Sequence, residues 1–148
     1  MLKKAKETLK NSPLLCEMIQ ADLNESLSLD NASVIVMNYT LQFIRPSNRS
    51  TLLKNIYNAL VPGGSLIVIE KVNSKIPGLN KTFIDFHHQF KKEKGYSKLE
   101  ISQKREALEN VLIPWTVEQN NHLIQSAGFS TTDLFFKWNN FAGFIALK

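Results

Sequence analysis

Glycine and cysteine are scarce in this chain, and each scarcity limits what the protein can be. The first glycine is Gly63 and the only cysteine is Cys16, in a sequence of 148 residues. One cysteine excludes a disulfide framework and a cysteine-rich zinc site. We therefore expect a reducing, cytoplasmic environment, in which Cys16, within an apolar run, is a buried and unreactive thiol.

Long hydrophobic runs are missing as well. No stretch approaches the roughly 18 apolar residues that a membrane-spanning helix needs, and the lysine-rich residues 2–7 do not follow the pattern of a secretory signal. Hydrophobic residues make up 43% of the sequence and charged residues 21%, which is typical of a folded domain rather than of a fibrous or disordered chain. We expect a single domain over residues 1–148, with no role at a membrane.

The charge is unevenly distributed along the chain. Its formal net value is +5, from 18 Lys and Arg against 13 Asp and Glu. Basic residues concentrate in two segments, 3–10 and 91–105, which both predict helices. Such a run usually forms a solvated helix face, and charge by itself indicates no particular partner. We expect no direct binding of nucleic acid, although the second cluster would suit a small anionic substrate.

The centre of the sequence predicts a parallel strand–helix–strand unit. Residues 33–37 and 65–70 are nearly continuous apolar runs, typical of strands buried on both faces of a parallel sheet. Residues 47–60 predict a helix with an apolar stripe, and the Pro62-Gly63-Gly64 turn follows it, where Gly63 can adopt the left-handed conformation.

The flanking segments complete an α/β pattern. Asn139-Asn140 is a plausible hairpin turn near the end of the chain. The predicted helices cover residues 2–9, 81–92, 97–112 and 116–128, and the remaining predicted strands cover 14–19, 132–138 and 141–147. A mostly parallel sheet that closes with an antiparallel hairpin is the layout of the Rossmann-like fold of S-adenosylmethionine-dependent methyltransferases.

Several short segments resemble one particular family within this superfamily. The sequence LVPGGSL at 60–66, followed by Glu70, looks like the helix–turn–strand signature of that superfamily. The segments NYTLQF at 38–43, HHQFK at 87–91 and LEISQKR at 99–105 resemble the bacterial carboxy-S-adenosyl-L-methionine synthase family. The resemblance extends over essentially the whole chain.

This resemblance implies a specific reaction. In the family, S-adenosyl-L-methionine and prephenate give carboxy-S-adenosyl-L-methionine and phenylpyruvate, by transfer of a carboxyl group and without a metal. The product serves a tRNA carboxymethyltransferase that forms uridine 5-oxyacetic acid at the wobble position. A homodimer is implied too.

The resemblance also assigns four binding residues. Asp22 and Leu23 match positions that hold the adenine, and Asn38 matches a residue that faces the methionine part. Arg105 matches an arginine that contacts the added carboxylate across a dimer interface. General chemistry agrees, because ligands of open α/β sheets bind beyond the carboxyl ends of the strands, and a guanidinium holds a carboxylate with two hydrogen bonds.

Each assignment has a plainer alternative. Asp22 and Asn38 are also common turn formers, and an arginine on a helix, such as Arg105, is more often a surface charge. His87 and His88 are adjacent, so on a helix they cannot share a metal, and packing is the better interpretation.

Two parts of a complete cofactor site are not found in the sequence. The glycine-rich turn after the first strand is absent, and so is the acidic residue that binds ribose hydroxyls. The chain thus looks like the family's C-terminal portion, with its first strands missing and strand 33–37 left as a bare apolar edge. Two alternatives stay open, an ordinary methyltransferase and a non-enzymatic dimerising remnant. Arg105 distinguishes the synthase from the methyltransferase, because a plain methyl donor has no added carboxylate for Arg105 to hold.

Overall fold

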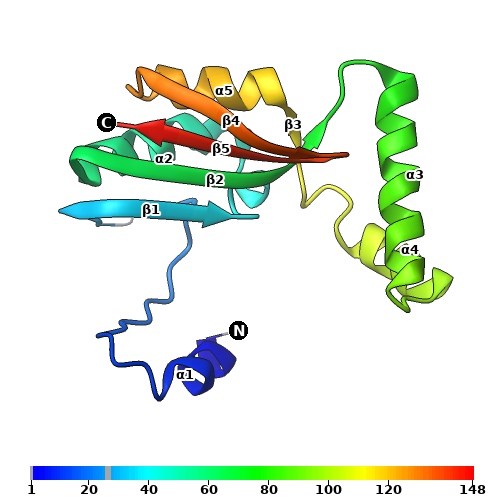
Figure 1. Ribbon diagram of the computed structural model, residues 1–148, viewed down its shortest axis with the longest axis horizontal. Helices are drawn as coiled ribbons and strands as arrows, with labels where there is room; N and C mark the ends of the chain where they lie inside the picture. The colour runs from blue at the N-terminus through cyan, green and yellow to red at the C-terminus, as the bar shows by residue number, and fades with distance from the viewer. Residues whose placement is uncertain (1, 26–27) are drawn as a thin grey trace.

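The computed structural model describes residues 2–25 and 28–148, and a five-stranded mixed sheet forms its centre (Figure 1). The strand order is β1-β2-β5-β4, and the short β3 pairs with β2. The strands are β1 (Ala32–Asn38), β2 (Leu60–Asn73), β3 (Trp115–Thr116), β4 (Thr131–Trp138) and β5 (Phe141–Leu147). β1 and β3 run parallel to β2, whereas β5 runs antiparallel to both β2 and β4. The predicted α/β class, the mostly parallel sheet and the closing hairpin are confirmed.

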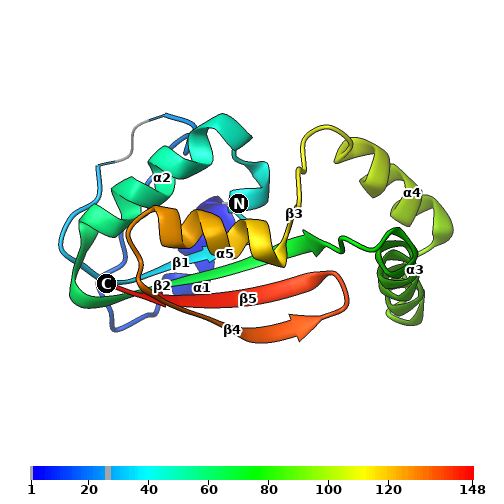
Figure 2. The ribbon, with the colours of Figure 1, turned by 90° about the horizontal axis from the view of Figure 1, so that it is seen from above.

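Two helices cover one face of this sheet. They are α2 (Pro46–Ala59) and α5 (Val117–Ser126), which lie side by side (Figure 2). The predicted apolar stripe of α2 packs into the core with the inward side chains of β2 and α5, namely Leu52, Leu53, Ile56, Leu66, Val68, Leu123 and Ile124. Burial of such side chains stabilises the fold by about 1.5–3 kcal/mol for each residue.

The remaining helices lie away from this core. α1 (Leu2–Leu9) stands apart below the sheet in Figure 1, and α3 (Pro77–Glu93) and α4 (Lys98–Ala107) lie beyond the C-terminal ends of β1 and β2. A short 3-10 helix, η1 (Leu41–Phe43), follows β1. None of the helices within residues 2–25 and 28–148 is long and apolar enough to cross a lipid bilayer.

The first residues of β2 depend on glycine for their conformation. Ala32 pairs with Leu60, but the next pair joins Val34 to Ser65, so residues 61–64 bulge out of the ladder. Gly63 has φ of +77°, in the left-handed region that favours glycine. Its N–H donates to the C-terminal Lys148 carbonyl at 3.0 Å. The predicted left-handed role of Gly63 is therefore confirmed.

Four expectations about individual segments are wrong. Residues 14–19 form no strand, and Leu15 is fully exposed, because no neighbouring strand is there to accept a ladder. Cys16, in the same segment, is exposed rather than buried. The helix predicted over 97–112 ends at Ala107, and the one predicted from residue 81 begins at Pro77, whose fixed φ suits a first helical turn.

The edge at β1 is bare, as the sequence predicted. β1 pairs only with β2 within the described residues, so one side of its backbone has no partner strand. Val34 and Val36 of this strand are each 56% exposed. This edge therefore presents unpaired backbone groups beside apolar side chains.

Candidate functional site

The chain turns sharply where β1 ends, and a buried carboxylate holds that turn. Asn38 is the last residue of β1, and Tyr39 follows with φ of +52°, a left-handed conformation. Glu70 of β2 accepts three backbone hydrogen bonds from the next residues. Its Oε1 accepts from the N–H of Thr40 at 3.0 Å and of Leu41 at 2.8 Å, and its Oε2 accepts from the N–H of Gln42 at 3.0 Å. The backbone beyond Asn38 is thus fixed relative to β2.

Glu70 is an unusual residue for a strand interior. Only 1% of its surface is exposed. Burial disfavours the charged carboxylate and raises its pKa to about 6, although the three N–H donors and the nearby Arg49 act in the opposite direction. The sequence marked Glu70 only as part of a signature. Its role as an anchor was missed, because its partners lie about 30 residues away in the chain.

Arg49 links the segment that follows β1 to the segment that precedes β3. It lies on α2 and is only 1% exposed. Its Nε donates to the Ile44 carbonyl at 3.0 Å and its Nη2 to the Ile113 carbonyl at 2.7 Å. The guanidinium also lies 4.6 Å from the ring centroid of Trp115. A buried arginine with these partners ties α2 to the segment before β3, and no pattern in the sequence indicates this role.

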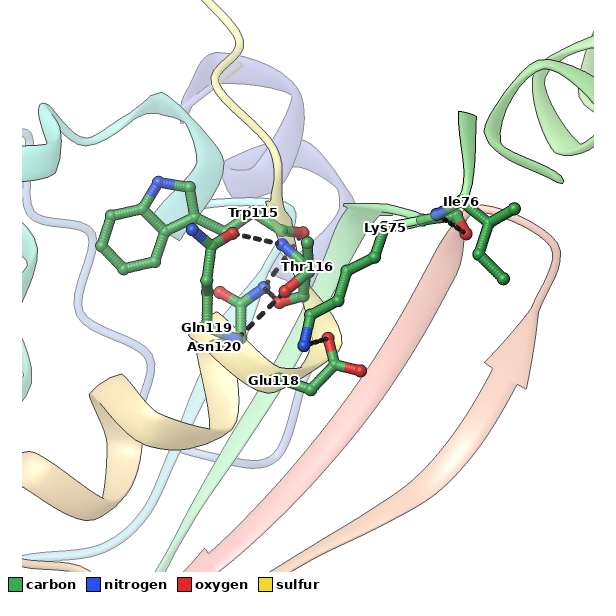
Figure 3. Close-up of polar contacts among 8 residues, drawn as sticks. Lys75, Ile76, Trp115, Thr116, Glu118, Gln119 and Asn120 are labelled. Atoms are coloured by element: carbon green, nitrogen blue, oxygen red, sulfur yellow. Dashed lines mark hydrogen bonds and ion pairs between the residues drawn. The ribbon is translucent and has the colours of Figure 1, made fainter. Parts of the chain in front are cut away.

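A capping box at the start of α5 fixes the position of the adjacent strand β3 (Figure 3). The Thr116 N–H donates to Gln119 Oε1 at 2.9 Å, and the Gln119 N–H donates to Thr116 Oγ1 at 3.2 Å. Figure 3 also shows the ion pair between Lys75 Nζ and Glu118 Oε2, at 3.6 Å. This cap holds the start of α5 directly after Trp115, whose ring lies beside the Arg49 guanidinium.

Asp22 lies in a turn that is attached to the start of α2. Its Oδ1 accepts from the backbone N–H of Asn24 at 2.9 Å and from Asn24 Nδ2 at 3.0 Å. These two hydrogen bonds lower the pKa of the exposed Asp22 carboxyl, so it is ionised at neutral pH. Asn24 Oδ1 accepts from the Arg45 N–H at 3.0 Å. Because Arg45 follows η1, this bond brings the Asp22 turn to the segment that leaves β1.

Leu23 is half-buried and packs against the hydrophobic core. Beside it, a hollow of about 220 Å³ opens between the turn and α2, lined in part by Asn24, Asn48 and Asn55. Asn38, by contrast, is exposed at the strand end. Asn38 thus lies at the carboxyl end of β1, the position where an open α/β sheet binds ligands, and the Asp22–Leu23 turn lies beside the start of α2.

Arg105 lies elsewhere. It is exposed on α4 and lines a cleft between α3 and α4, which none of Asp22, Leu23 and Asn38 lines. Within one chain, the fourth predicted residue is thus separate from the other three.

The two adjacent histidines differ in their surroundings. The His87 ring meets Phe141 edge-on, with 4.9 Å between centroids, and burial followed by repulsion from Lys91 and Lys71 lowers its pKa to about 4. His88 lines the α3–α4 cleft. In the described part of the chain, no three His, Cys, Asp or Glu side chains come close enough together to bind a metal. The packing role predicted for His87 is confirmed.

Known proteins resemble this chain along its whole length. The family model for a methyltransferase domain matches residues 1–68. The carboxy-S-adenosyl-L-methionine synthase of Nautilia profundicola is 45% identical over 148 residues, which cover 100% of this chain and 63% of that protein. The synthase of Methylococcus capsulatus is 47% identical over 132 residues, 89% of this chain and 54% of that protein. This chain is therefore similar to carboxy-S-adenosyl-L-methionine synthases over its whole length.

Solved structures agree at the level of the fold. A SAM-dependent methyltransferase of Leishmania major superposes with a TM-score of 0.65 at 16% identity, covering 100% of this chain and 51% of that one. The S-adenosylmethionine-dependent methyltransferase SibL gives 0.65 at 16% identity, covering 99% and 40%. At these identities the likeness shows a Rossmann-like methyltransferase fold and nothing finer.

The chain is shorter than its relatives. It spans 54–63% of the length of the two synthases. Sequence similarity to the synthases and the methyltransferase fold of the described residues are therefore shown, whereas the roles of Asp22, Leu23, Asn38 and Arg105 remain predictions.

Proposed function

We propose that this chain is the part of a carboxy-S-adenosyl-L-methionine synthase that holds S-adenosyl-L-methionine at the carboxyl end of β1. The observation that carries the proposal is the turn anchored by Glu70 directly after Asn38, in a chain 45% identical throughout to a synthase. In this proposal, the Asp22–Leu23 turn takes the adenine and Asn38 the methionine part. The buried Glu70 keeps that strand end rigid, so the ligand meets a preorganised surface.

The proposed reaction moves a carboxyl group from prephenate to S-adenosyl-L-methionine. The bond from the prephenate ring to its carboxyl carbon breaks, and a new bond joins that carbon to the methyl group next to the sulfonium. The ring hydroxyl and one methyl proton leave as water, so phenylpyruvate and carboxy-S-adenosyl-L-methionine balance the equation. No protein nucleophile is needed, and the chain's residues act by positioning and by electrostatics.

Arg105 completes the proposed site from a second subunit. Within one chain it lies apart from Asn38, on α4, which extends beyond the sheet (Figure 1). A homodimer in which α4 of each chain reaches the partner's strand end resolves that separation. The planar guanidinium then holds the added carboxylate with charge-assisted hydrogen bonds. We further propose that the product is passed in the cytoplasm to a tRNA carboxymethyltransferase.

The test is a product assay by mass spectrometry, with S-adenosyl-L-methionine and prephenate as substrates. It uses the 148-residue chain alone and the same chain extended by the N-terminal part of the Nautilia profundicola synthase. Because no glycine precedes Gly63, we expect weak cofactor binding and little product from the chain alone, and product from the extended chain. A micromolar Kd for the chain alone, about −8 kcal/mol, would contradict the expected weakness.

Arg105→Ala in the extended protein separates the synthase from an ordinary methyltransferase. We expect carboxy-S-adenosyl-L-methionine to bind more weakly by roughly 1.5–3 kcal/mol, the range for a hydrogen bond to a charged group, and S-adenosyl-L-methionine to bind almost unchanged. If the substitution weakens the binding of both ligands equally, Arg105 does not contact the carboxylate. That result would favour an ordinary methyltransferase. Asn38→Ala is expected to weaken both ligands.

A further inference from the structure

The cleft between α3 and α4 is lined by positive charge and by no carboxylate. Its volume is about 210 Å³. α3 contributes His88 and Lys92, and α4 contributes Lys98, Ile101, Ser102 and Arg105. Three of these six side chains are cations at neutral pH. A concave surface with several such donors attracts anions.

No cation that lines the cleft forms an ion pair within residues 2–25 and 28–148. The two ion pairs among the described residues are Lys75 with Glu118 and Lys81 with Asp85, and neither includes a cation of the cleft. Asp85 is the acid that faces His88 and Lys92, but its carboxylate is already held by Lys81 at 2.8 Å. Among the described residues, no ion pair therefore neutralises Lys92, Lys98 or Arg105.

Further basic groups raise the positive potential around His88. Lys71 of β2, Lys91 of α3 and Arg105 of α4 all face it, and Asp85 is the one acid in that set. Burial and then these cations lower the pKa of His88. Burial and then Lys91 also lower the pKa of Lys71. Like charges so arranged repel one another, and a bound anion would relieve that repulsion.

The spacing of the donors indicates the shape of the anion. Lys98 and Arg105 are seven residues apart on α4, two helical turns or about 10 Å along the axis. His88 and Lys92 are one turn apart on the facing helix, so they lie on one face of α3. Donors spread over two turns fit two separated anionic groups better than one compact phosphate.

We propose that the α3–α4 cleft binds a small dicarboxylate, with one carboxylate on Arg105 and the other on Lys92 and Lys98. The proposal deepens the proposed function, since prephenate carries a second carboxylate besides the one transferred. Arg105 keeps the role given above. Lys92 and Lys98 become specificity-determining residues that recognise the end of the co-substrate that does not react.

The experiment titrates the 148-residue protein with glutarate, acetate and inorganic phosphate, and follows binding by calorimetry and by ¹H–¹⁵N spectra. We expect glutarate to bind more tightly than either other anion, with shifts centred on residues 88–105. Lys92→Gln and Lys98→Gln should each weaken glutarate about tenfold, as expected for loss of one charge-assisted hydrogen bond. Lys92→Arg should retain binding, and Lys54→Gln, at an exposed position on α2, should leave it unchanged.

Equal affinity for the three anions would overturn the proposal. It would also be overturned if Lys54→Gln weakened glutarate binding as much as Lys92→Gln and Lys98→Gln, because that result would indicate a general effect of charge. Spectra of each variant show whether α3 and α4 remain folded, and Lys92→Arg separates charge from packing. The assay uses no S-adenosyl-L-methionine, so it is independent of the proposed reaction. Product formation by an extended protein without glutarate binding would contradict the dicarboxylate site alone.

Discussion

At the scale of single residues, Glu70 connects stability to the candidate site. Its pKa is raised from 4.5 to about 6 in the folded protein, so folding favours the protonated form. The stabilisation is fully present below the unfolded pKa and is lost as the pH rises through about 6. The shift corresponds to about 2 kcal/mol, at 1.36 kcal/mol for each pKa unit.

We therefore expect the free energy of unfolding to decrease from pH 4.5 to 6.5, and Glu70→Gln to remove this decrease. The substitution also replaces one acceptor oxygen by a donor among three N–H groups. At pH 7 it should destabilise the protein by roughly 1–3 kcal/mol and speed hydrogen exchange at residues 40–42. Urea denaturation across this pH range measures the first effect. A pH dependence that is identical in both proteins would contradict the role of Glu70.

Gly128 and Gly143 give a matched pair of predictions at the same scale. Gly128 has φ of +120°, and an added Cβ would lie 3.1 Å from the Tyr57 ring. That ring packs on Phe129 with 5.0 Å between centroids, so it has little room to move. A Cβ at Gly143 would lie 2.7 Å from the Cζ of Phe135, the far end of an exposed and mobile side chain.

Gly128→Ala is thus expected to cost about 1–3 kcal/mol because of backbone strain, and Gly143→Ala markedly less. Thermal unfolding of the two variants measures the difference. The reverse order would show that Phe135 is held more firmly than its exposure indicates.

At the scale of elements, the C-terminal lysine closes α2. Lys148 Nζ donates to the Leu60 carbonyl at 2.6 Å and to the Asn58 carbonyl at 3.2 Å, and it lies 4.9 Å from the Tyr57 ring centroid. A cation near the last carbonyls of a helix also interacts favourably with the helix dipole. Lys148→Gln should lower the free energy of unfolding by about 1–2 kcal/mol, whereas Lys54→Gln on the exposed face should not. Chemical denaturation of both variants checks this, and equal effects would contradict it.

Elements differ in how far the sequence could predict them. α2 was predictable because its apolar residues form a stripe with helical spacing, and β2 because residues 65–70 form a nearly continuous apolar run directly after two glycines. Residues 14–19 have the same apolar character, yet they form no strand, because pairing depends on a neighbour that the pattern does not report. Asn38 could be placed by the rule that ligands bind beyond strand ends. Its anchor at Glu70 could not, since a hydrogen bond across 30 residues leaves no local signal.

At the scale of the whole molecule, one edge of the sheet stays open. β1 offers unpaired N–H and C=O groups beside the exposed Val34 and Val36. Such an edge pairs readily with another chain. The segment before it is in contrast weakly held, because α1 has no buried residue and Leu15 is fully exposed.

We therefore expect the 148-residue protein to be non-monomeric above micromolar concentration, because β1 recruits the edge of a second molecule. Val36→Lys, which places a charge on the exposed face of this edge, should shift the protein towards monomer, whereas Lys54→Gln should not. Hydrogen exchange should show protection concentrated after residue 33 and little protection over residues 2–23, since the early segment lacks the burial and ladder bonds that slow exchange. Sizing with light scattering measures the first result. A sharp monomer peak together with uniform protection from the start of the chain would mean that the described strands form a sheet that needs no partner at β1.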